Sequence, residues 1–323
     1  MLIESDRRKR ILGVPLPHLF LGVTAMALGL ALCAAIIHHS GQGVVHWLGA
    51  LRELDPRWAM VVLAGMAVNL VLAAKKWQRV EACLASFPPS SNYAVSITAI
   101  GWGVGQFLPV PVAAAAVRGL GNRLCSRSGR HGMLASVWEQ LFDLAAAVLL
   151  TVPALIALMH GSLAVVVAVT TLAIVFGELA AVRIPGLLIR VARMNLALGA
   201  PSLCRFLWRL SLLRTIILMA VTVVVARAMA AEIRPELIAA SVPPVILAGV
   251  LSCVPAGIGV NELSFVSLLG LAGVGSPAAT AFALVNRGLQ LIIALVLALA
   301  GAVAIAVNWP KHVRQSATLM DAE

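Results

Sequence analysis

A stretch broken by proline and glycine, Val-Pro-Ala-Gly-Ile-Gly-Val-Asn-Glu at residues 254–262, lies inside otherwise apolar sequence and ends in an acid. Lipid offers backbone groups no hydrogen-bond partners. A broken helix at membrane depth is therefore stable only where protein buries it or where it lines a polar cavity. A glutamate at that depth is costly, and such residues generally serve a function. The stretch predicts a polar site inside a bilayer and argues against a passive anchor.

The rest of the chain consists largely of long apolar runs, and 61% of its residues are hydrophobic while 11% are charged. A spanning helix needs about 20 mostly apolar residues. Two apolar stretches, residues 93–117 and 237–272, are interrupted by prolines. Six other runs clearly meet the length requirement: residues 16–37, 58–76, 133–159, 163–182, 210–230 and 278–308.

The net charge of +11 is spread over short basic runs between the apolar spans, which is the pattern that sets membrane topology. With a cytoplasmic N-terminus, 19 of the 24 Lys and Arg residues fall on the cytoplasmic side, including Lys76, Arg118 and Arg214. This holds only if each proline-broken stretch enters and leaves the membrane on one side. The charges therefore predict six spans, two oppositely oriented re-entrant hairpins and a cytoplasmic C-terminus.

The two broken stretches have related surroundings. Pro109 precedes Glu139 by 30 residues, and Pro255 precedes Asn286 by 31 residues. Each of these polar residues lies on a long apolar helix that carries another polar side chain four positions later. Three crossings separate the two copies, so we expect an inverted repeat of the kind found in many secondary transporters.

No signature of a soluble enzyme or of nucleic-acid binding is present. The sequence has no Gly-x-x-x-x-Gly-Lys-Ser/Thr loop for ATP, no His-Glu-x-x-His zinc motif and no basic patch with interleaved aromatic residues. We therefore expect one all-α membrane domain over residues 1–323. Within it, residues 1–15 form a cytoplasmic segment, 16–308 the transmembrane bundle and 309–323 a cytoplasmic tail.

Charged residues inside the spans are candidates for a site. Glu139 and Asp143 lie one turn apart on the same helix face. Two carboxylates so placed repel each other, so either one keeps its proton or a cation lies between them. Arg287 is the only basic residue that we place well inside a span, and it needs an anionic partner. That partner is either Glu139 or Asp143, in a structural ion pair, or a bound anionic group.

Glu262 begins the returning half of the second broken stretch. A carboxylate interacts favourably with a helix N-terminus, and Asn261 is equally suited to capping it. Half-helix N-termini inside membranes commonly face an anionic substrate group. Both a local capping role and a substrate-binding role therefore stay open for these two residues.

Four segments together resemble the flippase-like membrane domain of lysylphosphatidylglycerol synthases, which also occurs as free-standing proteins. They are residues 106–118, 136–144, 255–262 and 286–287, and the likeness extends from about residue 16 to residue 307. The resemblance implies movement of an anionic or modified lipid between leaflets. The residues that match the family pattern are Arg118, Glu139, Asp143, Gly257, Gly259, Glu262 and Arg287.

Two departures from the family pattern concern the lipid headgroup. The first hairpin reads Pro-Val-Pro-Val-Ala at residues 109–113 where relatives usually carry a glycine and an acid, and Asn261 stands where a basic residue is common. The synthase domain itself is not found in this sequence. We therefore expect that the chain does not make the lipid.

These observations predict an inner-membrane lipid translocase, or a transport accessory, rather than an enzyme. Its lipid would be anionic, glycosylated, polyprenyl-linked, hopanoid-related or aminoacylated, and the seven matching residues with Asn261 and Asn286 would bind it. We expect no catalytic residue, metal or cofactor. Two alternatives are a non-transporting membrane partner of a lipid-modifying glycosyltransferase and a secondary transporter of a small hydrophilic solute. The direction of movement, the coupling ion and the oligomeric state are left open.

Overall fold

The computed structural model describes residues 54–320, apart from 86–88, 126, 161–162, 193–195 and 230. Before residue 54 it describes only 10–11, 14–15, 24, 27, 29–35, 38 and 49. Two short strands, β1 (Arg10–Ile11) and β2 (Val14–Pro15), pair antiparallel. Every other named element in the described part of the chain is a helix, and the predicted all-α fold is confirmed.

Five helices are long and apolar enough to cross a membrane. They confirm five of the six predicted spans and make the chain a multi-pass membrane protein. The remaining predicted span, residues 16–37, lies mostly outside the described residues. The last helix continues well beyond the predicted span end at residue 308. The five helices are α4 (Pro56–Leu84), α7 (Gly129–His160), α8 (Leu163–Ala192), α9 (Pro201–Ala228) and α12 (Ser276–Met320).

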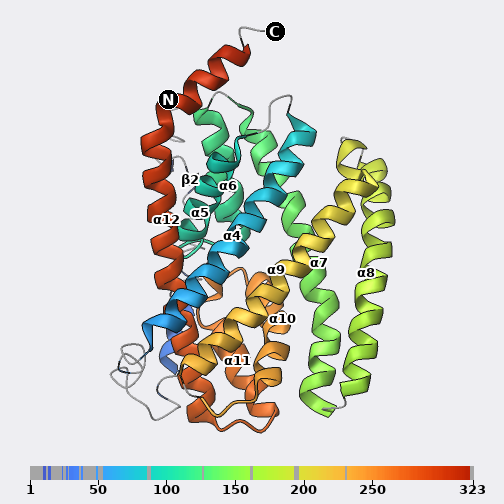
Figure 1. Cartoon of the computed structure of the whole chain (residues 1–323), viewed down its shortest axis with the longest axis vertical. Coiled ribbons are helices and arrows are strands. Elements are labelled where there is room, and N and C mark those ends of the chain that lie inside the picture. The colour runs from blue at the N-terminus through green and yellow to red at the C-terminus, as the bar shows by residue number, and fades with distance from the viewer. Residues whose placement is uncertain are drawn as a thin grey trace, which may run out of the picture.

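Each proline-broken stretch forms a pair of short helices instead of a span. The first hairpin consists of α5 (Ser91–Val104) and α6 (Val110–Leu124), and the second of α10 (Pro235–Leu251) and α11 (Val260–Leu271). A helix of 14 residues, such as α5, extends about 21 Å, which is too short to cross a bilayer core. In Figure 1 the first hairpin occupies the upper half of the bundle and the second the lower half. The predicted opposite orientation is confirmed.

Two groups of four helices, α4–α7 and α9–α12, make corresponding contacts. Helix α5 packs on α12 and α6 on α7, while α10 packs on α7 and α11 on α12; α4 packs on its own counterpart, α9. When α4, α5, α6 and α7 are exchanged with α9, α10, α11 and α12 in that order, the same set of contacts results. Because α7, α8 and α9 cross between the hairpins, the two copies run in opposite directions (Figure 1). The packing supports the predicted inverted repeat.

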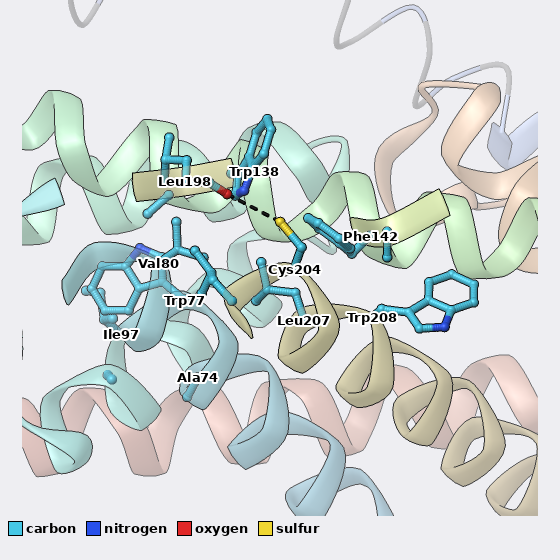
Figure 2. Close-up of a cluster of buried hydrophobic side chains, with 14 of the residues drawn as sticks. Ala74, Trp77, Val80, Ile97, Trp138, Phe142, Leu198, Cys204, Leu207 and Trp208 are labelled. Carbon is cyan, nitrogen blue, oxygen red and sulfur yellow. Dashed lines mark hydrogen bonds between the residues drawn. The ribbon is translucent and has the colours of Figure 1, made fainter. Parts of the chain in front are cut away.

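Aromatic side chains fix the helices around the first hairpin. Figure 2 shows this cluster, in which Trp77 of α4, Trp138 and Phe142 of α7, and Trp208 of α9 are buried. The rings of Trp138 and Phe142 meet edge to face with centroids 6.2 Å apart. Such contacts between large rings contribute to packing beyond their buried area. They hold α4, α7 and α9 beside the polar residues described below.

The tips of the two hairpins differ in their surroundings. In the second hairpin the backbone turns through positive φ angles at Gly257 (66°) and Gly259 (80°). A Cβ atom at Gly259 would overlap the carbonyl oxygen of Gly29 and the side chain of Leu32, so the helical residues 29–35 cover this tip. Phe107, at the tip of the first hairpin, is instead exposed. The tip of the second hairpin is therefore covered by residues 29–35, whereas Phe107 at the tip of the first hairpin is exposed.

Candidate functional site

Five charged residues gather between the first hairpin and helices α4, α7 and α9. We call Lys76, Arg118, Glu139, Asp143 and Arg214 the charged cluster. Lys76 is fully buried, and Arg118 and Glu139 are each 2% exposed. Charges so deep in a membrane bundle are costly unless each is paired. The hydrogen bonds of the cluster show how that pairing is achieved.

Arg118 joins the first hairpin to α7. Its Nη1 atom donates to Glu139 Oε1 at 2.5 Å, and its Nη2 atom donates to Thr98 Oγ1 at 3.0 Å. The guanidinium also lies over the ring of Trp77, with 5.2 Å between Cζ and the ring centroid. Arg118 therefore has an acid, a hydroxyl and an aromatic face as partners.

Asp143 is held by two cations from α4 and α9. Lys76 Nζ donates to Asp143 Oδ1 at 2.5 Å, to Ser211 Oγ at 2.7 Å and to the backbone oxygen of Glu139 at 3.1 Å. Arg214 Nη1 donates to Asp143 Oδ2. The sequence left two possibilities for Glu139 and Asp143: one acid keeps its proton, or a cation lies between them. The structure has cations beside both acids.

The sequence-based assignment of three of these cations was wrong. The charge count placed Lys76, Arg118 and Arg214 in cytoplasmic connections, and it treated Arg287 as the only basic residue well inside a span. Lys76 does not lie in a connection, because α4 continues past it to Leu84, and its side chain is buried against α7 and α9. Arg214 lies inside the predicted span 210–230, so the signal of an intramembrane charge was present there.

A second polar cluster joins α11 to α12. Arg287 Nε lies 3.4 Å from Glu262 Oε1, and its Nη1 atom donates to the backbone oxygen of Ala256 at 3.1 Å. Glu262 Oε2 accepts the backbone N–H of Gly259 at 2.6 Å, as expected for a carboxylate near a helix N-terminus. Of the alternatives left open for Arg287, the ion pair with Glu139 or Asp143 does not form, because these acids bind other cations.

The two clusters follow the inverted repeat. In the first copy, Arg118 on the returning hairpin helix pairs with Glu139 on the next long helix. In the second copy, Glu262 on the returning hairpin helix pairs with Arg287 on the next long helix. The same helix-to-helix tie is therefore present twice with its charges exchanged. The sequence spacing matched Glu139 with Asn286, which is the immediate neighbour of Arg287.

The remaining predicted residues lie in or beside the second cluster. Asn261 Nδ2 donates to the backbone oxygen of Ala256 at 3.2 Å, and Asn286 Oδ1 accepts Gln290 Nε2 at 3.2 Å. Gly257 and Gly259 instead form the turn itself. Bulk at either glycine would meet protein atoms, and Gly257 faces the side chain of Asn261.

Two cavities adjoin these clusters. The first encloses about 190 Å³ and is lined by Arg118, Glu139, Asp143 and Arg214 among apolar residues. The second encloses about 100 Å³, and its polar lining residues are Thr222, Asn261, Glu262, Asn286, Arg287 and Gln290. Leu218 and Ile246 line both cavities, so the two are neighbours.

The two polar clusters differ in charge. With all five groups ionised, the charged cluster contains three cations and two anions and has a formal charge of +1. The second cluster has one cation and one anion. Among the described residues, no group of three or more His, Cys, Asp and Glu side chains could hold a metal ion. Because the charged cluster has a formal charge of +1, its side chains could bind an anion in the first cavity.

Residues 19–298 match the family described as lysylphosphatidylglycerol synthase TM region. The match includes both hairpins and both polar clusters. The chain belongs to this family. Membership confirms the resemblance seen in the sequence and relates the chain to membrane domains concerned with lipid handling. Searches of curated proteins and of solved structures find no match.

Proposed function

We propose that this member of the lysylphosphatidylglycerol synthase TM region family moves a lipid with an anionic headgroup between the leaflets of a bacterial inner membrane. Both termini would lie in the cytoplasm, and the protein would transport the lipid rather than modify it. The observation that carries the proposal is the excess positive charge beside the first cavity. A structural tie needs equal charges, whereas Asp143 alone has two cationic partners.

The place of the first cavity supports a lipid rather than a water-soluble substrate. Its wall includes Val110, which is also 41% exposed. Apolar residues such as Trp102, Leu218 and Val250 form much of the remaining wall. A headgroup in this cavity would lie close to the lipid-facing surface while its acyl chains stayed in the bilayer.

The orientation of the hairpins supports movement rather than static binding. Opposed broken helices that meet near the middle of a membrane are typical of proteins in which two repeats give access to one site from alternate sides. Here the two cavities share wall residues from α9 and α10. A headgroup that moved between the two hairpins would pass from one polar cavity to the other beside the apolar residues Leu218 and Ile246.

Vesicles reconstituted with the purified protein test this proposal. A fluorescent phospholipid labelled on its headgroup is placed in both leaflets, and a membrane-impermeant quencher reports the fraction that reaches the outer leaflet. We expect quenching beyond the outer-leaflet fraction without added ATP, and none beyond it in protein-free vesicles. Uptake of a water-soluble anion without lipid movement would instead favour a solute transporter.

A further inference from the structure

The cations of the charged cluster differ in how many of their donors are already used. Lys76 has three N–H groups, and all three donate to protein acceptors. Its side chain has no exposed surface. Arg118 is 2% exposed and is enclosed by Glu139, Thr98 and Trp77. Arg118 lines the cavity and its Nε atom has no hydrogen-bond partner among the described residues, but that atom is buried. Neither residue therefore presents an exposed donor to a molecule that enters the cavity.

Arg214 is different. Its side chain is 14% exposed, and it lines the first cavity. Its Nε atom donates to Asn69 Oδ1 at 2.7 Å, and its Nη1 atom donates to Asp143 Oδ2. Within the described part of the chain, no acceptor is hydrogen-bonded to its Nη2 atom. Arg214 is therefore the most exposed cation of the cluster, and its Nη2 donor is unpaired among the described residues.

Two acceptors fix the direction of this donor. A guanidinium is planar, and its N–H groups have fixed directions, so holding Nε and Nη1 also orients Nη2. Asn69 on α4 and Asp143 on α7 provide these two anchors. A donor that is oriented before binding loses little conformational freedom when a ligand arrives.

We infer that Arg214 binds the oxyanion of the ligand, a phosphate group, through Nη2, with Asn69 and Asp143 as positioning residues. The inference rests on the cavity of the proposed function and specifies its recognition chemistry. A phosphate monoanion would bring the formal charge of the cluster from +1 to zero. The geometry suits phosphate because guanidinium donors match the spacing of oxyanion oxygens.

Equilibrium binding of radiolabelled short-chain phosphatidic acid to the purified, intact chain tests the assignment. The variants are Arg214→Gln and Arg214→Lys, and the matched control is Arg209→Gln. Arg209 lies on the same helix, is 68% exposed and pairs with Glu178 away from the cavity. We expect Arg214→Gln to weaken binding about 10- to 100-fold, as for loss of a hydrogen bond to a charged group, and Arg209→Gln to bind like the wild type.

The lysine variant separates geometry from charge. It keeps a cation beside Asp143, which favours folding, but it lacks the fork that reaches both Asp143 and the cavity. We expect binding weaker than that of the wild type. Unchanged affinity in Arg214→Lys would overturn the role of Nη2, and unchanged affinity in a folded Arg214→Gln would overturn the role of the residue.

Excess inorganic phosphate distinguishes a lipid phosphate from free phosphate. Displacement of phosphatidic acid by inorganic phosphate would support Arg214 as a site for the free anion, and failure to displace it would support the lipid headgroup as the ligand. A wild type that binds through Arg214 but moves no lipid in vesicles would contradict the proposed function alone. Variants that bind normally while the wild type moves lipid would contradict this inference alone.

Discussion

Replacing Arg118 with methionine removes the only hydrogen-bond donor to the Glu139 carboxylate within the described structure. Both side chains of this pair are at most 3% exposed, and their closest charged atoms are 2.5 Å apart. Breaking a buried pair by removing one partner typically costs about 3–5 kcal/mol, because it leaves an uncompensated charge. We expect a loss of stability in this range, reduced if Glu139 takes up a proton.

The two single variants should differ. Glu139→Gln leaves Arg118 with Thr98 at 3.0 Å and the face of Trp77, so we expect a smaller loss than for Arg118→Met. The double variant, Arg118→Met with Glu139→Gln, removes both charges and should recover much of the stability lost by Arg118→Met. Reversible unfolding in mixed detergent micelles would give the free energy of unfolding of each variant.

An exposed pair provides the control for this cycle. Arg209 and Glu178 have side chains that are 68% and 30% exposed. Exposed pairs contribute about 0–1 kcal/mol, so Arg209→Met with Glu178→Gln should show little coupling. The reasoning would be refuted if Arg118→Met proved no more destabilising than Arg209→Met.

Three further predictions follow from the hairpins. Arg287→Met should destabilise the protein less than Arg118→Met, because Glu262 keeps the N–H of Gly259 at 2.6 Å and the lost ion pair is longer, at 3.4 Å; the same unfolding assay compares them. Leucine at Gly257 and Gly259 should abolish lipid movement in vesicles, because both positions need positive φ, and unchanged movement would reduce the turn to a packing detail. Cysteine labelling in intact cells should place residues 123–130 and the C-terminus in the cytoplasm and Gly275 outside; an external C-terminus would contradict the hairpin orientation.

The architecture was largely predictable because its signals are local. Length and hydropathy indicated the five described spans, and prolines within apolar stretches indicated the hairpins. The basic runs predicted the orientation of the hairpins, although two of the counted residues, Lys76 and Arg118, are buried and Arg214 is only 14% exposed.

The pairing of charges was not predictable in the same way, because it depends on contacts between distant helices. Lys76 and Asp143 are 67 residues apart in the sequence, and Arg214 and Asp143 are 71 apart. Spacing along one helix identified Glu139 and Asp143 but not the cations that face them. Arg287 of α12 pairs with Glu262 of α11, the preceding helix, and the packing of these two helices decides which groups meet.

The covered tip of the second hairpin has a consequence for biosynthesis. Chains emerge from the ribosome N-terminus first, so Gly29 and Leu32 are made long before Gly259, which packs against them. The hairpin of α10 and α11 would therefore dock onto residues 29–35, which are synthesised much earlier. Its seating would then be among the last steps of assembly, because contacts between distant parts of a chain form slowly. We expect the native Cys33, which lies on the covering residues 29–35, to be protected from thiol reagents only after synthesis is complete. Protection in nascent chains that stop before α12 would show that the hairpin docks earlier.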